Sequence, residues 1–221
     1  MRWNLPNSLT LLRLVAAPGV AVMFLYFHRP WADWFALVLF IGAAATDYID
    51  GYLARLWKQQ TRFGTMLDPI ADKAMVVIAL MVLTGYSGMN PWLILPTTVI
   101  LFREVFVSGL REFLGAQAGL LKVTKLAKWK TTAQMVAIAV LFLGTGLEHV
   151  EGIARQGMTM EAYAAAVSAG EADPIRSCGA RGCSSYATIA GLTLIWLAAV
   201  LTAITGWDYF RKALPFLREE R

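Results

Sequence analysis

The stretch at residues 47–73 reads DYIDGYLARLWKQQTRFGTMLDPIADK and lies between two apolar runs. Its four aspartates form two pairs, Asp47 with Asp50 and Asp68 with Asp72. Residues three or four apart on an α-helix share a face, so we expect each pair on one face of its own helix. The short polar segment between the pairs predicts a helical hairpin, across which the two pairs of carboxylates face each other.

The rest of the sequence has the composition of a membrane protein. Of its 221 residues, 57% are hydrophobic and 16% are charged, whereas a soluble domain usually carries about 25% charged residues. The apolar runs are near the roughly 20 residues that a helix needs to cross a bilayer. We therefore predict an all-α integral membrane protein with six transmembrane helices. The expected spans are residues 9–27, 31–46, 64–83, 91–109, 131–147 and 188–207.

The basic residues predict the orientation of these spans. Cytoplasmic loops of membrane proteins carry an excess of Lys and Arg. With the N-terminus inside, thirteen basic residues fall on the inner side and four on the outer side, so both termini are expected in the cytoplasm. The inner residues are Arg2, Arg55, Lys58, Arg62, Arg111, Lys122, Lys125, Lys128, Lys130, Arg211, Lys212, Arg218 and Arg221, and the outer ones are Arg29, Arg155, Arg176 and Arg181.

The chain is expected to form a single domain over residues 1–221, without an internal repeat. Its long polar segment, residues 148–187, is predicted to be an outer loop, and no chemistry is assigned to it. This loop contains Cys178 and Cys183, which would form a disulfide if that side is oxidising or remain two free thiols. The net charge of +5 suits anionic lipid head groups. Nucleic acid is not expected as a partner, because the basic residues are spread over several loops.

Four carboxylates gathered at one hairpin would repel one another unless cations neutralise them. Ionisable residues at membrane depth are costly and usually functional. Oxygen ligands without His or Cys favour Mg²⁺ or Mn²⁺, and two such ions would suit a pyrophosphate by bridging its oxygens. The alternative is that the aspartates form salt bridges with Arg55, Arg62 and Lys73.

The same stretch contains the pattern D-x2-D-G-x2-A-R-x8-G-x3-D-x3-D. The pattern resembles the signature of the CDP-alcohol phosphatidyltransferase family at every fixed position. The resemblance implies a six-helix membrane fold, usually dimeric, with a site for two divalent metal ions. The fixed positions are Asp47, Asp50, Gly51, Ala54, Arg55, Gly64, Asp68 and Asp72.

The resemblance also implies a role for each of these residues. Asp47, Asp50 and Asp68 would be metal ligands, and Asp72 would be both a ligand and the catalytic base. The substrate would be CDP-diacylglycerol, which gives up its phosphatidyl group to a small alcohol. The pocket for its cytidine diphosphate would be lined by Gly51, Ala54, Arg55 and Gly64.

Other stretches bear on the acceptor alcohol. NLPNSLTLLRLVAAP, REVFVSGLRE, KLAKWKTTAQM and LTAITGWDYFRKAL resemble the bacterial branch of the family that uses sn-glycerol 3-phosphate and forms phosphatidylglycerophosphate in the cytoplasmic membrane. A phosphate monoester carries about two negative charges near neutral pH, so a basic cluster is expected to bind it. Its members would be Arg111, Lys128, Lys125 and Lys130. The aspartate pattern alone leaves inositol phosphate, serine and phosphatidylglycerol as alternative acceptors.

Three polar residues recur at helical spacing at the start of the first span. Asn7 is either a helix N-cap or a neighbour of the substrate phosphates. Arg13 either extends its charged end to the membrane surface or lies near the same phosphates, and Thr10 lies between them. An ion-coupled transporter is a competing function, but the inverted repeat that many transporters show is not evident. A non-catalytic scaffold would leave the aspartates unexplained.

Overall fold

The computed structural model of the protein is all-helical over the residues that it describes. These are residues 5–29, 31–56, 61–115, 125–155, 157–159, 161, 162, 165, 166, 169 and 186–217. The long helices are α1 (Leu5–Tyr26), α2 (Trp31–Leu56), α3 (Arg62–Tyr86), α4 (Pro91–Leu114), α5 (Lys125–Arg155) and α7 (Tyr186–Leu217).

Two of these helices begin at residues that cap their free backbone N–H groups. The Thr61 hydroxyl accepts a hydrogen bond from the Gly64 N–H at 3.0 Å at the start of α3. The Asn90 side chain accepts one from the Trp92 N–H at 3.0 Å at the start of α4, where Pro91 takes the first helical position. Such residues stabilise helix starts, so both starts are encoded locally.

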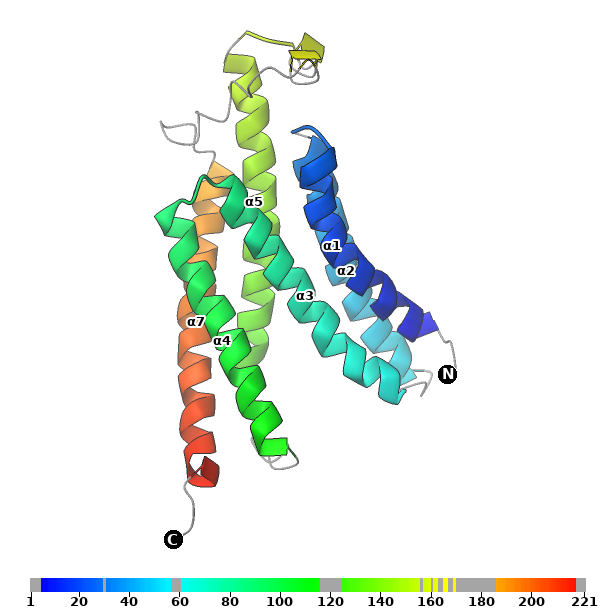
Figure 1. Ribbon diagram of the computed structural model, residues 1–221, viewed down its shortest axis with the longest axis vertical. Helices are drawn as coiled ribbons and strands as arrows, with labels where there is room; N and C mark the ends of the chain where they lie inside the picture. The colour runs from blue at the N-terminus through cyan, green and yellow to red at the C-terminus, as the bar shows by residue number, and fades with distance from the viewer. Residues whose placement is uncertain are drawn as a thin grey trace.

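The helices form two groups (Figure 1), which contact each other through α2 and α5 and, less extensively, through α3. Helix α1 packs along α2 and α3, while α4, α5 and α7 pack together, and α2 also contacts α5. The N-terminal ends of α1 and α3 and the C-terminal ends of α2, α4 and α7 lie at the same end of the bundle (Figure 1). The hairpin between α2 and α3, which carries the aspartates, is therefore at that end.

The core between the helices is apolar and closely packed. Fully or almost fully buried side chains come from different helices, including Phe40 of α2, Met75 of α3, Ile100 of α4, Phe142 of α5 and Ile195 of α7. Burial of apolar side chains against one another in this way maximises van der Waals contact between the helices, and in a bilayer such packing is the main source of helix association.

Helices α5 and α7 approach closely at two glycines. A Cβ built on Gly144 would lie 2.8 Å from the backbone nitrogen of Thr188, and one on Gly191 would lie 2.8 Å from the side chain of Leu141. Small residues at such contacts let helix backbones approach each other in membrane proteins. The spacing of α5 and α7 is thus set by these two positions.

A buried ion pair lies at the opposite end of the bundle from the aspartate hairpin. Arg29 donates to Asp33 through Nη2 at 2.6 Å and through Nε at 2.8 Å. The Asp33 side chain is fully buried, and the Arg29 guanidinium lies over the rings of Phe24 and Tyr86. The pair joins the turn after α1 to the first turn of α2.

The outer faces of the helices carry many exposed apolar side chains. Leu25, Val38, Phe102, Val105 and Phe113 are each about seven-tenths exposed, and soluble monomers rarely expose apolar surface on this scale. Four helices are long and apolar enough to cross a membrane, over Asn7–Tyr26, Pro91–Leu114, Trp129–Ile153 and Tyr186–Leu217. The prediction of an all-α membrane protein is therefore confirmed, while crossings by α2 and α3 remain predictions.

The helices extend past the apolar spans expected from the sequence. Helix α5 continues to Arg155, past the residue at which the outer loop, residues 148–187, is expected to begin, and the outer position of this segment stays a prediction. The physical reason is that His149 and Ile153, four residues apart and therefore on one helical face, are both buried at 3% exposure. The question of a disulfide between Cys178 and Cys183 concerns residues outside the described part of the chain.

Candidate active site

An arginine of α1 joins the two aspartate-bearing helices. Arg13 Nη1 donates to Asp47 Oδ1 of α2 at 2.6 Å and to Asp72 Oδ1 of α3 at 2.9 Å. The Arg13 side chain is 1% exposed, whereas those of Asp47 and Asp72 are 43% and 41% exposed. The two carboxylates therefore contact the guanidinium on the protein side and remain open on the other.

Asp68, the other aspartate of the hairpin whose side chain is described, also contacts a residue of α1. Thr10 donates a hydrogen bond to Asp68 Oδ1 at 2.7 Å. One turn earlier, Asn7 Oδ1 accepts a hydrogen bond from the Thr61 hydroxyl at 2.8 Å. Because Asn7, Thr10 and Arg13 are three residues apart, they lie along one face of α1. We call these three residues the α1 polar stripe.

The stripe runs close to α3 because α3 has a glycine there. A Cβ built on Gly64 would lie only 2.7 Å from Asn7 Oδ1 and 3.3 Å from Thr61 Oγ1. Gly64 is buried, so a side chain at this position would push α1 away from the aspartates. The sequence interpretation of Gly64 as part of a nucleotide pocket did not include this packing role.

The structure thus brings Asp47, Asp68 and Asp72 together along α1. Asp50 lies in α2, but its side chain is outside the described part of the chain. Of the ion-pair partners considered from the sequence, Lys73 donates to the Ser108 hydroxyl of α4, and the side chains of Arg55 and Arg62 are not described. Asp47 and Asp72 instead share Arg13 as a partner. In the sequence, the helical spacing of Arg13 with Asn7 and Thr10 was the one sign that it could contact the site.

The donor set is the one that a hard divalent cation prefers. Carboxylate oxygens without His or Cys suit Mg²⁺ or Mn²⁺, and Asp47 and Asp72 each present about two-fifths of their side chain to the outside. Among the described residues, no group of three or more His, Cys, Asp or Glu side chains is arranged to hold a metal ion. The side chain of the fourth aspartate, Asp50, is outside that set, and the fit of the hairpin to a metal ion rests on the carboxylate chemistry of Asp47, Asp68 and Asp72.

The other residues expected in the nucleotide pocket are only partly described. Gly51, Ala54 and Arg55 lie in the last turns of α2, and their side-chain positions lie outside the described part of the structure. The same holds for Lys125 and Lys128 in the first turn of α5.

The two described members of the expected basic cluster have different surroundings. Lys130 is buried at 4% exposure and forms an ion pair with Glu104 of α4. Arg111, near the end of α4, is exposed, and its guanidinium lies 5.6 Å from the centre of the Tyr209 ring. A cation over an aromatic face is weakly attracted to it, so Arg111 remains able to bind an anion.

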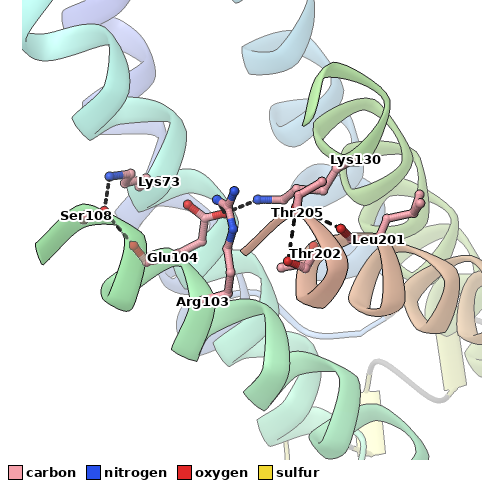
Figure 2. Close-up of polar contacts among 8 residues, drawn as sticks. All are labelled: Lys73, Arg103, Glu104, Ser108, Lys130, Leu201, Thr202 and Thr205. Carbon is pink, nitrogen blue, oxygen red and sulfur yellow. Dashed lines mark hydrogen bonds and ion pairs between the residues drawn. The ribbon is translucent and has the colours of Figure 1, made fainter. Parts of the chain in front are cut away.

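Lys130 belongs to a larger polar network that joins α3, α4 and α5 (Figure 2). Glu104 also accepts from Arg103 at 3.2 Å, and the Ser108 hydroxyl, which Lys73 contacts, donates to the Glu104 backbone carbonyl at 2.6 Å. Two cations, Arg103 and Lys130, therefore pair with the Glu104 carboxylate. A third, Lys73, reaches the backbone carbonyl of Glu104 through Ser108. We call Lys73, Arg103, Glu104, Ser108 and Lys130 the Glu104 network.

No pattern in the sequence connects Glu104 to α3 or α5. Arg103 also fits against α7, where a Cβ built on Gly206 would lie 2.8 Å from Arg103 Cγ. Only helix packing reveals these contacts, because the partners are 26 residues or more apart along the chain.

Comparison with known proteins identifies relatives of the whole chain. The sequence model of the CDP-alcohol phosphatidyltransferase family matches residues 3–170. A Cereibacter sphaeroides protein named CDP-diacylglycerol–glycerol-3-phosphate 3-phosphatidyltransferase is 82% identical over 221 residues, which is 100% of both chains. A Rickettsia bellii protein of the same name is 36% identical over 208 residues, 94% of each chain. One from Escherichia coli is 41% identical over 143 residues, 64% of this chain and 78% of that protein.

Proposed function

The chain belongs to the CDP-alcohol phosphatidyltransferase family, and we propose that it transfers the phosphatidyl group of CDP-diacylglycerol to sn-glycerol 3-phosphate. The products are phosphatidylglycerophosphate and CMP. The full-length relative that is 82% identical carries the name of this reaction. The observation in the structure that carries the proposal is the convergence of Asp47, Asp68 and Asp72 on the α1 polar stripe.

Asp72 is the catalytic base in this proposal. A hydroxyl of the acceptor attacks the phosphorus atom that is bonded to diacylglycerol. A new P–O bond forms to the acceptor, the P–O bond to CMP breaks, and the hydroxyl proton passes to the Asp72 carboxylate. Such base catalysis typically accounts for a factor of about 10²–10⁴ in rate. The exposed side of Asp72 is available for this contact, since its other side faces Arg13.

Two divalent ions, Mg²⁺ or Mn²⁺, complete the site. Asp47, Asp50, Asp68 and Asp72 would hold them, and bound ions would supply positive charge to the pyrophosphate as its negative charge develops. Within the chain, Thr10 and Arg13 orient three of these carboxylates. The cytidine diphosphate would lie beside Gly51, Ala54, Arg55 and Gly64, with Arg55 contacting a phosphate oxygen.

The acceptor phosphate would bind on the α4–α5 side of the site. The proposed ligands are Arg111, Lys128, Lys125 and Lys130. The Glu104 network supports this placement because Lys73, Arg103 and Lys130 bring three cations to that side of the site. Basic side chains of this kind complement a phosphate, which carries about two negative charges.

The chain is a multi-pass membrane protein, and we place it in the bacterial cytoplasmic membrane with six spans. Thirteen basic residues on one side against four on the other favour cytoplasmic termini. The N-terminus of α1, the C-terminus of α7 and the aspartate hairpin lie at one end of the bundle (Figure 1), so the active site would face the cytoplasm. The family resemblance supports a homodimer that accommodates lipid around its apolar surface.

A panel of acceptors tests the reaction. The purified protein is given CDP-diacylglycerol and Mg²⁺ with sn-glycerol 3-phosphate, inositol phosphate, serine or phosphatidylglycerol, and the release of CMP is measured. We expect release only with sn-glycerol 3-phosphate. Release with another acceptor at an equal or higher rate would assign the chain to a different branch.

A substitution tests the role of Asp72. We expect Asp72→Asn to lower turnover by about 10²–10⁴, because an amide cannot accept the proton, and to weaken binding of CDP-diacylglycerol much less. Asp208→Asn, at a carboxylate of α7 that is as exposed as those of Asp47 and Asp72, serves as the matched control. Near-native turnover of Asp72→Asn would place the base elsewhere.

A further inference from the structure

The α1 polar stripe contributes one full charge to the site, at Arg13. An arginine side chain stays protonated in proteins, and that of Arg13 is 1% exposed. A buried charge requires a partner, because removal of a charge from water is costly. The contacts of Nη1 with Asp47 and Asp72 supply that partner.

The arrangement gives Arg13 the position of a bridging cation. A single nitrogen contacts one carboxylate oxygen on each of two helices, at 2.6 Å and 2.9 Å. The carboxylates are open only on the side away from Arg13. A divalent ion would therefore approach them from the exposed side, with the guanidinium fixed behind them.

We propose that Arg13 is a built-in counter-ion that holds Asp47 and Asp72 together in the metal-free protein and thereby weakens their affinity for divalent ions. The inference rests on the proposed function, in which these carboxylates are metal ligands. Without Arg13, the repulsion between the two carboxylates would separate α2 from α3 until a metal binds. With Arg13, the hairpin is already assembled, and the metal meets a site whose negative charge is partly neutralised.

The two effects of Arg13 on the metal have opposite signs. Orientation of the ligands favours binding, whereas repulsion between the guanidinium and a divalent ion opposes it. The repulsion acts between a full positive charge and an ion that carries two, close to one another in a partly buried site where water screens weakly. Orientation is the smaller effect, since the two carboxylates are half-exposed and each hydrogen bond to them contributes modestly. Repulsion therefore outweighs orientation.

Arg13→Gln separates the two effects when metal affinity and stability are measured on the same protein. Binding of Mg²⁺ is followed by titration calorimetry, and thermal unfolding is followed with and without Mg²⁺, both on the full chain in lipid nanodiscs. We expect Arg13→Gln to bind Mg²⁺ at least about tenfold more tightly than the wild type. We also expect its unfolding temperature to fall without Mg²⁺ and to recover largely with it.

Three variants serve as controls. Arg13→Lys keeps the charge, so its Mg²⁺ affinity should stay close to that of the wild type. Thr10→Val removes a neutral donor from Asp68 and should weaken Mg²⁺ binding rather than strengthen it. Arg29→Gln breaks the other buried arginine–aspartate pair, far from the site, and should lower stability equally with and without Mg²⁺.

The outcomes distinguish the inference from the proposed function. If the wild type binds Mg²⁺ but Arg13→Gln binds it equally or more weakly, Arg13 is not a competing counter-ion and the inference is wrong, while the metal site stands. If stability lost in Arg13→Gln is not recovered by Mg²⁺, Arg13 is a structural residue only. If the wild type binds no Mg²⁺, both the metal part of the proposed function and this inference are overturned.

Discussion

Substitution of Gly64 by alanine tests whether close contact between α1 and α3 assembles the aspartate site. The added Cβ would lie 2.7 Å from Asn7 Oδ1, whereas ordinary contacts of this kind begin at 3.4 Å. The Asn7 side chain cannot easily turn away, because it is 6% exposed and accepts a hydrogen bond from Thr61. Relief of the clash would therefore move α1 from α3 and break that hydrogen bond.

The expected loss of stability follows from three contributions. Overpacking of a close contact costs about 1–3 kcal/mol, and loss of the hydrogen bond from Thr61 costs about 1 kcal/mol. Alanine gains about 1 kcal/mol over glycine in a helix interior. The net loss for Gly64→Ala is about 2 kcal/mol, which lowers Tm by about 4–8 °C in a chain of this length.

Thermal unfolding in nanodiscs measures this loss, with Gly42→Ala as the matched control. A Cβ on Gly42 of α2 meets nothing within 4 Å, so this variant should be as stable as the wild type or slightly more stable. The double variant Asn7→Ala/Gly64→Ala should recover part of the loss, because the clashing atom is gone. If Gly64→Ala unfolds at the same temperature as Gly42→Ala, the close contact is not what positions α1. A raised KM for CDP-diacylglycerol at unchanged stability would instead favour the nucleotide-pocket role alone.

Three further predictions concern other parts of the molecule. Asp33→Ala removes the bidentate partner of Arg29 and should cost about 3–5 kcal/mol. Asp208→Ala, at a half-exposed ion pair within one helix, should cost less than about 1 kcal/mol, and equal shifts in thermal unfolding would contradict this difference. Gly144→Ala places a Cβ 2.8 Å from the backbone nitrogen of Thr188, which cannot rotate away. This variant should lose about 3 kcal/mol of stability, and wild-type stability would refute the packing argument. Excess EDTA should abolish CMP release, and Mg²⁺ or Mn²⁺ should restore it; undiminished release in EDTA would remove the metals from the mechanism.

Local sequence patterns were enough to predict the class of the protein and the position of its most informative residues. Apolar runs of about 20 residues predict membrane helices because the bilayer fixes the length that an apolar segment must have. The spacing of Asp68 and Asp72 predicts a shared helical face because the helical period is fixed. Both rules are local, so no knowledge of the tertiary structure was needed. The aspartate pattern predicted the family in the same way, from one continuous stretch.

The residues that contact the aspartates became evident only from the packing of the helices. Arg13 and Asp72 are 59 residues apart, and Lys130 and Glu104 are 26 apart, so helical spacing cannot pair them. The sequence left Arg13 with two interpretations and assigned Gly64 to a nucleotide pocket, while packing gives Arg13 its two carboxylates and gives Gly64 its contact with Asn7. Helix α5 likewise extends beyond the apolar run that the sequence shows, because burial of His149 and Ile153 depends on neighbouring helices. Helix formation is governed by nearby residues, whereas the choice of partner depends on how whole helices pack, and that choice is made only when the bundle assembles.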